Sequence, residues 1–313
     1  MRRLLDVDLR LLRIFRAVAE HQGLAGAELV LGLSPTRISA GLAELEARLG
    51  ARLCRRGRSG FALTEAGDTV YEASHELFAA VDRFSNRAGA VAEGVRRVLR
   101  LGTVDALVTN GELRLPELMR RFRQRLPSAQ IDFLTAAPEE LERQVLGGRR
   151  DLAVVPSLNR RSELLYQPLF AERQSLYCAS RHPLARWPGD DVPASALGEH
   201  AFVARGYLHS EDLRRIGHRG AEATVETMEA QLILILSGEF IGYLPAHYAR
   251  AWEAGGELRR LNEPAFGYAS PFFAVRTQAA FDNPLVRAFL ELLAASPVPS
   301  IRAGGTRRRP ARS

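Results

Sequence analysis

The sequence contains no lysine, so all 43 of its basic residues are arginines. They outnumber 36 acidic residues, and the formal net charge of the 313-residue chain is +7 at pH 7. A GC-rich coding bias is the simplest cause of the missing lysine, but the physical consequence does not depend on the cause. Every strong cation is a planar guanidinium, which matches phosphate groups and guanine edges. The composition is compatible with a nucleic-acid partner but does not prove one.

Cysteine is also scarce. Cys54 and Cys178 are the two cysteines, and they fall in regions assigned below to different domains. A disulfide framework or a cysteine zinc site is therefore excluded. The chain also lacks an apolar run of 18 residues and an N-terminal apolar segment of the signal-peptide type. These absences predict no membrane partner and a reducing, cytoplasmic location.

Catalytic motifs are missing as well. The seven histidines show no His-Glu-x-x-His spacing, and no nucleophile elbow, P-loop or Gly-x-Gly-x-x-Gly loop follows a predicted strand. The acidic pairs Glu139-Glu140 and Asp190-Asp191 are adjacent in sequence, and nothing in their spacing assigns one residue as a general acid and the other as a general base. We expect neither an enzyme nor a bound cofactor or metal. An exported solute-binding protein would need a signal segment, so it is a weaker alternative.

The stretch from Leu24 to Leu49 predicts two short helices with a sharp turn, preceded by a helix over residues 8–21. Ser34 is a good N-cap for the last helix, Pro35 suits its first position, and Gly50 ends it. Apolar residues at spacings of four, three and four predict one buried face: Ile38, Leu42, Leu45 and Leu49. The segment is typical of a helix-turn-helix, and an ordinary amphipathic surface helix is the alternative.

The opposite face of this helix is small and carries one charge. Its members near the N-terminus are Thr36, Arg37, Ala40 and Gly41. We predict that Arg37 reads a base and that Ser34, Thr36 and Ser39 contact phosphates or base edges, with Pro35 at the same surface. Phosphate contacts fix the position of a protein on DNA, whereas base contacts give sequence specificity.

A wing is predicted after the third helix. Leu53 and Leu63 would anchor two short strands, and Arg55, Arg56 and Arg58 lie between them beside two glycines. Such a loop can straddle a phosphate backbone or probe a minor groove, and a solvated arginine cluster is the alternative. Up to residue 62 the chain has eleven arginines against six acidic residues, a net charge of +5. Most of the positive excess therefore lies in the first fifth of the chain.

The region from Thr64 to about Ala92 predicts one long helix. Leu63, Val70, Leu77, Phe84 and Val91 recur every seven residues, with Ala66, Ala73 and Ala80 as a second position. This heptad pattern is typical of a coiled-coil seam, so Val70, Leu77, Phe84 and Val91 are predicted to hold a dimer together. A long helix packed on its own domain is the alternative.

From Val98 to Val155 strands and helices alternate, which predicts a parallel sheet with crossover helices, and a second series of strands and helices follows. The predicted strands are Val98–Thr103, Ala129–Thr135, Asp151–Val155, Leu165–Phe170, Ser175–Ala179, His200–Ala204, Ala223–Val225, Phe240–Tyr243 and Pro271–Arg276, and helices fall at 115–123, 138–146, 209–217, 226–237, 245–253 and 283–295. We predict four regions: a DNA-binding domain over 1–63, a linker helix over 64–94, an α/β domain over 95–296 and a disordered basic tail over 297–313. The α/β domain would have lobe I at about 95–167 and 268–296 and lobe II at about 168–267.

A ligand in this domain should bind in the cleft at the carboxyl ends of strands. The candidate residues there are Thr103, Asp105, Thr109, Thr135, Arg205 and Thr227. Hydroxyls at helix starts suit an anionic group, and Arg205 could clamp a carboxylate. Asp105 would repel a carboxylate and favours an amine or a hydroxylated ligand. Each residue has an alternative reading as a cap or a polar loop group.

The chain resembles a LysR-type transcriptional regulator, most specifically in its N-terminal region. The residues that carry the resemblance are Phe15, Ala17-Val18-Ala19-Glu20, Ala27, Leu31, Leu33-Ser34, Ser39, Leu42, Leu45-Glu46, Leu49-Gly50, Leu53, Arg56 and Leu63-Thr64-Glu65-Ala66-Gly67, followed by Leu115-Pro116, Phe122-Arg123, Leu141, Gly148, Asp151-Leu152-Ala153-Val154 and His182-Pro183-Leu184-Ala185. The resemblance covers roughly residues 6–296.

The resemblance implies a winged helix-turn-helix, a dimerising linker helix and a two-lobed effector domain of the periplasmic-binding-protein type. It also implies double-stranded promoter DNA, a small-molecule effector and copies of the same chain, usually as a homotetramer, as partners; RNA polymerase is a further candidate. The sequence departs from the family pattern at Glu28, Pro35 and Ala40, where relatives commonly have a small residue, glutamine and arginine. We therefore expect Arg37 and the wing to carry more of the recognition.

Some relatives sense oxidants through cysteine, so a thiol- or peroxide-responsive regulator is the alternative function. Cys54 lies beside Arg55, which could lower the pKa of its thiol, whereas Cys178 lies in an apolar strand. Two lone cysteines in separate domains make an intramolecular disulfide switch a poor fit.

Overall fold

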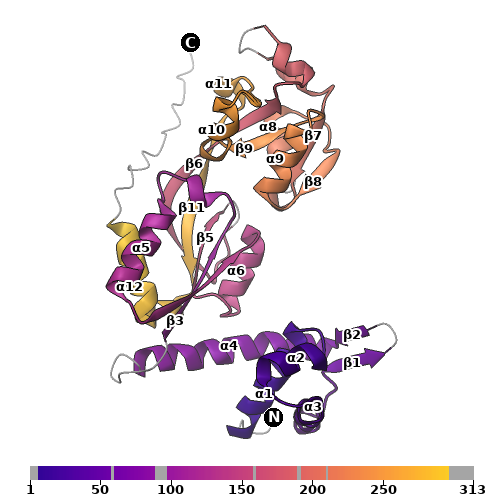
Figure 1. Cartoon of the computed structure of the whole chain (residues 1–313), viewed down its shortest axis with the longest axis vertical. Helices are drawn as coiled ribbons and strands as arrows, with labels where there is room; N and C mark the ends of the chain where they lie inside the picture. Colours follow the sequence, from indigo (N-terminus) through magenta and orange to yellow (C-terminus); the bar gives the residue numbers. More distant parts are fainter. Residues whose placement is uncertain are drawn as a thin grey trace, which may run out of the picture. The chain divides into compact units, whose positions relative to one another are not determined.

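The chain divides into two compact units in a computed structural model that describes residues 6–57, 60–88, 97–157, 160–188, 192–208 and 211–295 (Figure 1). One unit contains Met1–Phe84 with Gly147–Arg149, and the other contains Ser85–Leu146 with Arg150–Ser313. The predicted tail over 297–313 lies outside the described residues. No helix in the described ranges is long and apolar enough to cross a lipid bilayer.

The N-terminal unit contains the predicted helices and the wing. Its elements are α1 (Asp6–Glu20), α2 (Leu24–Leu31), α3 (Pro35–Leu49), β1 (Cys54–Gly57), β2 (Gly60–Leu63) and α4 (Glu65–Ala88). α3 ends at Gly50 as expected, and α2 ends at Gly32; the two glycines have φ of 70° and 62°, a left-handed conformation that glycine adopts without a Cβ penalty. Three helices and a two-stranded antiparallel wing confirm the winged helix-turn-helix prediction.

The contact between α1 and α3 corrects two of the predicted positions. Gly41 does not lie on the exposed face; it is buried against Ile14 and Leu11 of α1, because the absence of a side chain lets the two helices approach closely. Leu49 was predicted to be buried but is 46% exposed, at the last turn of α3. A bidentate pair between Arg48 and the buried Asp8 closes the end of this interface.

The first half of α4 packs on its own domain. Val70 and Leu77 are half-buried against the N-terminal core, and Phe78 is buried within it. Phe84 is 72% exposed, and Ala73 and Ala80 are also exposed. The alternative of a helix packed on its own domain therefore describes Val70 and Leu77, while Phe84 remains available for a partner. The fourth predicted seam residue, Val91, lies outside the described residues.

The second unit contains two α/β lobes. Its elements are β3 (Arg97–Thr103), η1 (Leu107–Thr109), α5 (Leu115–Arg125), β4 (Ala129–Thr135), α6 (Pro138–Leu146), β5 (Leu152–Pro156), β6 (Leu165–Ala179), η2 (Pro183–Arg186), α7 (Ala194–Leu197), β7 (Ala201–Arg205), η3 (Gly206–Leu208), α8 (Glu211–Ile216), β8 (Ala223–Val225), α9 (Met228–Leu236), β9 (Phe240–Pro245), α10 (Ala246–Ala254), β10 (Leu258–Arg260), α11 (Glu263–Phe266), β11 (Tyr268–Arg276), η4 (Ala279–Asp282) and α12 (Pro284–Ala294). The short elements α7, β10 and α11 were missed by the sequence analysis.

The sheet is mixed, with parallel pairs in each lobe and antiparallel pairs along β6 and β11. The strand order is β4-β3-β5-β11-β6-β9-β7-β8, with β10 also paired to β6. β3 pairs in parallel with β4 and β5, as predicted, and β7 pairs in parallel with β8 and β9. β11 and β6 run antiparallel to each other and to their other neighbours, so the parallel pairing predicted for the first three strands does not extend across the whole sheet.

β6 is one continuous strand, which corrects the prediction of two strands separated by a break at residues 171–174. The residues between the two predicted strands are mostly polar, yet Glu172 and Gln174 are 5% and 1% exposed because their side chains enter a buried hydrogen-bond network. One half of β6 pairs with β11 and the other half also reaches β9 and β10. Phe170 and Phe272 stack with their ring centroids 4.8 Å apart where these two long strands connect the lobes.

Helices cover both faces of each lobe. In lobe I, α5 and α12 pack over one face, where Phe122 and Phe289 meet, and α6 packs over the other through Leu141 and Val145 (Figure 1). In lobe II the alternation along β7 sends Phe202 into one core and Val203 into the other, against α9 and α10. The crossover helices predicted from the sequence are thus present in both lobes.

The close packing of Gly67 against Leu53 at the base of the wing can be tested by substitution. The Thr64 hydroxyl donates to the Arg52 carbonyl and accepts from the Gly67 N–H, at 2.6 and 2.9 Å. A Cβ added at Gly67 would lie 2.0 Å from the Leu53 carbonyl oxygen. We expect Gly67→Ala to destabilise the N-terminal unit by about 1–3 kcal/mol through overpacking, measured by denaturant unfolding. Gly111→Ala, where no atom lies within 4 Å of the added Cβ, is the control; equal stability of the two variants would contradict the packing.

Candidate nucleic-acid interface and ligand pocket

The N-terminus of α3 is the exposed end of the helix-turn-helix. The Ser34 hydroxyl accepts from the Arg37 N–H at 3.5 Å, which is a long capping bond, and Pro35 occupies the first helical position. Ser34, Pro35, Thr36 and Arg37 are exposed, and Ser39 is partly exposed. The structure therefore brings all five predicted residues of the helix to one surface.

The wing lies beside this surface. Arg55 on β1 is exposed, whereas nothing is described of the Arg56 side chain and Arg58 lies outside the described residues. The Glu46 carboxylate of α3 accepts from the backbone N–H groups of Leu53 and Cys54 at 2.7 and 3.2 Å, which ties β1 to the helix. Within the described part of the chain, neither Arg37 nor Arg55 forms an ion pair, so both cations are available to a ligand.

A groove of about 840 Å³ runs between α3 and the base of the wing, and its lining includes Ser39, Arg52 and Arg55. Arg52 was not among the predicted residues; it is exposed and follows Gly50 at the turn after α3. Its position directly before Leu53, the predicted anchor of the first wing strand, could have indicated that it lies at the base of the wing. Two arginines and a hydroxyl in one groove are suited to a phosphate backbone.

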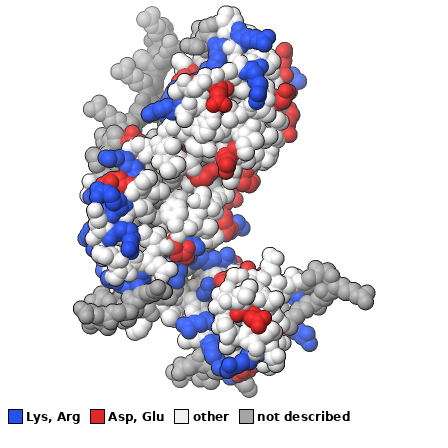
Figure 2. All heavy atoms as spheres, in the orientation of Figure 1, with Lys and Arg blue, Asp and Glu red and all other residues white. Residues whose placement is uncertain are grey.

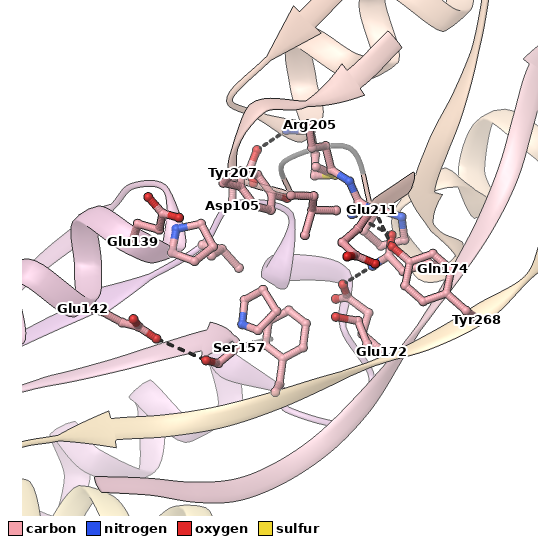
Figure 3. Close-up of a pocket in the computed structure, with 18 of the residues that line it drawn as sticks. Asp105, Glu139, Glu142, Ser157, Glu172, Gln174, Arg205, Tyr207, Glu211 and Tyr268 are labelled. Carbon is pink, nitrogen blue, oxygen red and sulfur yellow. Dashed lines mark hydrogen bonds between the residues drawn. The ribbon is translucent and has the colours of Figure 1, made fainter. Parts of the chain in front are cut away.

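The second site is a pocket of about 350 Å³ between the two lobes of the C-terminal unit (Figure 3). Lobe I contributes Asp105 after β3, Glu139 and Glu142 of α6 and Ser157 after β5; lobe II and the connecting strands contribute Glu172, Gln174, Arg205, Tyr207, Glu211, Arg214 and Tyr268. Apolar residues such as Val104, Met228 and Phe272 complete the lining. This size is suited to a small organic molecule.

The pocket is acidic. Its lining holds five carboxylates, from Asp105, Glu139, Glu142, Glu172 and Glu211, and two guanidinium groups, from Arg205 and Arg214. Acidic side chains also gather where the two lobes meet on the face shown in Figure 2. Burial raises the pKa of Asp105 and of Glu142, although a backbone N–H bond to Asp105 and the Tyr166 and Ser157 hydroxyls beside Glu142 oppose the shift.

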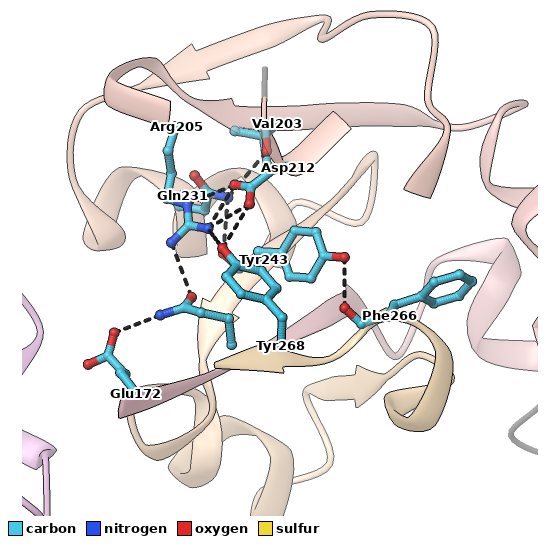
Figure 4. A network of polar contacts seen from close by, with 9 residues as sticks. Glu172, Val203, Arg205, Asp212, Gln231, Tyr243, Phe266 and Tyr268 are labelled. Carbon is cyan, nitrogen blue, oxygen red and sulfur yellow. Dashed lines mark hydrogen bonds and ion pairs between the residues drawn. The ribbon is translucent and has the colours of Figure 1, made fainter. Parts of the chain in front are cut away.

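A buried polar network forms one wall of the pocket (Figure 4). The Arg205 guanidinium donates to both Asp212 carboxylate oxygens, from Nε at 2.9 Å and from Nη2 at 2.8 Å. It also donates to Gln174 Oε1 at 3.1 Å and to the Tyr268 hydroxyl at 2.5 Å. Arg205 and Asp212 are 5% and 1% exposed. Because Asp212 already occupies the planar fork, this arrangement speaks against the prediction that Arg205 clamps a ligand carboxylate.

The network continues along β6 toward lobe I. Gln174 Nε2 donates to Glu172 Oε2 at 2.6 Å, and Glu172 Oε1 lies 2.8 Å from His247 Nε2. Asn110 Nδ2 lies 3.4 Å from the same Glu172 oxygen, and the Thr109 hydroxyl lies 2.8 Å from His247 Nδ1. Glu172 therefore connects the strand shared by the lobes to the loop after β3 and to α10.

The predicted effector residues are only partly brought together. Asp105 and Arg205 line the pocket. The other four, Thr103, Thr109, Thr135 and Thr227, are not among the residues described as lining it. Thr103 is buried in the core, Thr109 bonds His247, Thr135 is exposed at the end of β4, and Thr227 is the N-cap of α9, accepting from the Ala230 N–H at 3.2 Å. For Thr227 the alternative reading as a cap is correct.

Several lining residues were missed, although one pattern could have indicated two of them. Glu172 and Gln174 are two residues apart in β6, so their side chains point to the same face of the strand. Two polar residues on one face within an apolar strand are a signal of a buried site. By contrast, Tyr207, Glu211 and Tyr268 come from η3 and from the starts of α8 and β11, and their proximity depends on the tertiary structure.

The chain belongs to the LysR family of bacterial transcriptional regulators. Residues 9–68 match the bacterial regulatory helix-turn-helix protein of the lysR family, and residues 92–297 match the LysR substrate binding domain. These two segments coincide with the winged helix-turn-helix and with the two-lobed α/β domain. The protein is thus a DNA-binding transcriptional regulator with an effector-binding domain, as the sequence predicted.

Two relatives of known sequence extend over nearly the whole chain. The HTH-type transcriptional activator BauR of Pseudomonas aeruginosa is 37% identical over 292 residues, which are 93% of this chain and 96% of the relative. The HTH-type transcriptional regulator CbbR of Cereibacter sphaeroides is 27% identical over 302 residues, covering 93% and 94%. A probable hydrogen peroxide-inducible genes activator of Mycobacterium xenopi is 30% identical over 174 residues, 56% of this chain and 90% of the relative.

Solved structures of full-length regulators share the fold. Full-length OxyR from Pseudomonas aeruginosa superposes with a TM-score of 0.65 at 18% identity, covering 95% of this chain and 97% of that one. Full-length CbnR complexed with its target DNA gives a TM-score of 0.63 at 21% identity, covering 92% and 99%. The predicted fold class is therefore confirmed.

The Arg205–Asp212 pair should be a major determinant of the stability of the C-terminal unit. Asp212→Asn removes the charge that compensates a buried guanidinium, and breaking a buried pair from one side costs about 3–5 kcal/mol. We expect a loss of this order in denaturant unfolding of the full chain, followed by circular dichroism. The control is Glu117→Gln, which breaks an exposed pair with Arg120 and should cost under about 1 kcal/mol. A small effect at Asp212 would show that Arg205 is compensated elsewhere.

Proposed function

We propose that the N-terminus of α3 enters the major groove of operator DNA while the groove between α3 and the wing holds a phosphate backbone. The observation that carries the proposal is the pair of exposed arginines, Arg37 and Arg55, without ion-pair partners in the described part of the N-terminal unit. In this assignment Arg37 reads a base edge, and Ser34, Pro35, Thr36 and Ser39 position the helix. Arg52, Arg55, Arg56 and Arg58 neutralise phosphates.

We propose further that the pocket between the lobes is the effector site. It lies at the carboxyl ends of β3, β5 and β7, it has the volume of a small molecule, and its two walls come from different lobes. A ligand that contacts both walls stabilises one arrangement of the lobes over others, which is how a ligand shifts a conformational equilibrium. Asp105 and Arg205 remain the two sequence-predicted residues in this site.

The regulator is proposed to act as a homodimer that assembles into a homotetramer in the cytoplasm, with RNA polymerase as a candidate partner at the promoter. Phe84, Ala73 and Ala80 support self-association, because they form an exposed apolar face on α4. Two copies of the winged helix-turn-helix would read two half-sites, and the binding free energies of the half-sites add.

The alternative of a thiol- or peroxide-responsive regulator is supported by the similarity to peroxide-inducible activators but not by the cysteines themselves. Cys178 is completely buried and Cys54 is 6% exposed. Burial raises the pKa of the Cys178 thiol to about 12, although Arg259 nearby opposes the shift, so the reactive thiolate is scarce at neutral pH.

The DNA assignment is tested by recovering bound genomic fragments with the purified full-length protein and measuring affinity for one of them across a salt series. Arg55→Ala should weaken binding to specific and scrambled duplexes alike and reduce the slope of log K against log salt by about one. Arg37→Ala should instead reduce discrimination between the duplexes by about 1–3 kcal/mol. Arg120→Ala removes the same charge in the other unit and should change neither quantity. An unchanged slope for Arg55→Ala, or unchanged discrimination for Arg37→Ala, would contradict the assigned role.

The thiol alternative is tested by titrating the native protein with a disulfide reagent such as DTNB. Because both thiols are buried, we expect slow reaction in the native state and rapid reaction of both in denaturant, and peroxide should not alter operator binding. Fast modification of Cys178 in the native protein, together with a change in operator binding that Cys178→Ser abolishes, would support the redox function instead.

A further inference from the structure

We propose that the group of the effector recognised between the lobes is a protonated amine, bound by the carboxylates of the pocket. This inference rests on the proposed function of the pocket and adds the chemical class of its ligand. Five carboxylates line the pocket against two guanidinium groups, so the wall carries an excess of negative charge. A cleft of one sign concentrates small ligands of the opposite sign.

Both guanidinium groups are already paired with carboxylates of the chain. Arg205 binds both oxygens of the buried Asp212, and Arg214 pairs with Glu211 three residues before it on α8. A ligand carboxylate would have to displace Asp212 from the fork and would then leave a second acid in the same buried space. The cost of leaving a buried charge unpaired argues against such an exchange.

The N-terminus of α9, which could otherwise bind an anion, is occupied as well. Oδ2 of Asp105 accepts from the Met228 N–H at 2.5 Å, and the Thr227 hydroxyl caps the Ala230 N–H. A helix N-terminus attracts an anion through its free N–H groups and its dipole. A carboxylate of lobe I therefore already occupies this helix N-terminus, and the two guanidinium groups among the described lining residues are both paired within the chain.

Two of the lining carboxylates are buried. Glu172 is 5% exposed, accepts from the amides of Gln174 and Asn110, and lies 2.8 Å from His247 Nε2. Glu142 is 5% exposed, with the Tyr166 hydroxyl at 3.0 Å and Arg161 Nε at 3.5 Å. Burial penalises the charged form of a carboxylate, and it raises the pKa of both Asp105 and Glu142. A carboxylate loses its favourable interaction with water when it is buried. An ammonium group in the pocket would offset that loss by a charge-assisted hydrogen bond.

The carboxylates lie on both sides of the pocket (Figure 3). Glu139 and Glu142 are on α6 of lobe I, whereas Glu172 and Glu211 lie on the opposite side, on β6 and α8. A compact amine can therefore contact one side, and a short diamine can bridge the two lobes. Bridging would couple ligand binding to the arrangement of the lobes.

The test is isothermal titration of the full-length protein with 1,4-diaminobutane, n-butylamine and succinate at matched ionic strength, followed by footprinting on a recovered operator. We expect both amines to bind, the diamine more tightly, and succinate not to bind. The diamine should also alter the footprint. Because a diamine can bind DNA directly, the titration is performed without DNA.

Two charge-neutral variants locate the binding. Asp105→Asn retains an acceptor for the Met228 N–H, and Glu139→Gln changes an exposed residue, so both should fold. Each should weaken diamine binding about tenfold or more, as expected for one unit charge at short range in a partly buried site. The matched control is Glu140→Gln on the same helix, because Glu140 pairs with Arg143 and is not among the described lining residues; its affinity should equal that of the wild type.

The results of these titrations distinguish the proposed effector site from the proposed amine class of its ligand. Diamine binding that both variants weaken and the control does not would support the inference. Equal binding by wild type and both variants would overturn it, since the amine would then bind elsewhere. Binding of succinate in place of the amines, with an altered footprint that Asp105→Asn also modifies, would overturn the amine class but uphold the pocket as the effector site. If the footprint changes only with ligands whose binding is unaffected by Asp105→Asn and Glu139→Gln, both the amine class and the pocket as the effector site would be overturned.

Discussion

The pairing of β6 with β11 is the constraint on which the ligand-binding unit depends. These two long antiparallel strands belong to both lobes, and β6 buries Glu172 and Gln174. These two side chains find hydrogen-bond partners in His247, Asn110 and Arg205, which lie on other segments. The network therefore keeps the strand continuous through a polar sequence, and it also forms a wall of the pocket. The stability of the fold and the proposed ligand site therefore depend on the same buried groups.

This sharing explains the charge of the pocket. Arg205 is needed to compensate Asp212 in the interior of lobe II, so its fork is committed to the fold. The surplus of carboxylates is left facing the space between the lobes. In the N-terminal unit, arginines rather than carboxylates remain exposed. Arg48 is committed to Asp8 inside the fold, while Arg37 and Arg55 remain exposed on the surface proposed to bind DNA. The two units thus present charges of opposite sign to their ligands.

Local sequence signals predicted the helix-turn-helix more accurately than the pocket. Ser34, Pro35 and Gly50 mark the ends of α3 through backbone chemistry that acts within a few residues, and the structure confirms each of them. The heptad pattern in α4 was ambiguous, because a helix packed on its own domain and a helix in a dimer need the same apolar spacing. Val70 and Leu77 face the domain core, while Phe84 does not. Thr227 was predicted as a ligand residue, yet hydroxyls at helix starts cap the helix in either case.

The sequence by itself determined the family, the winged helix-turn-helix, the order of the α/β elements and the surface of α3 with its exposed Arg37. These properties follow from periodicity, caps and composition, which are local or cumulative along the chain. Only the tertiary structure decided that β6 is one strand, that Gly41 is buried, that Arg205 is held by Asp212 and that five carboxylates from distant segments line one pocket. The physical reason is that charge compensation depends on distance in space, and the partners of Glu172 and Arg205 are separated from them by up to 75 residues of sequence.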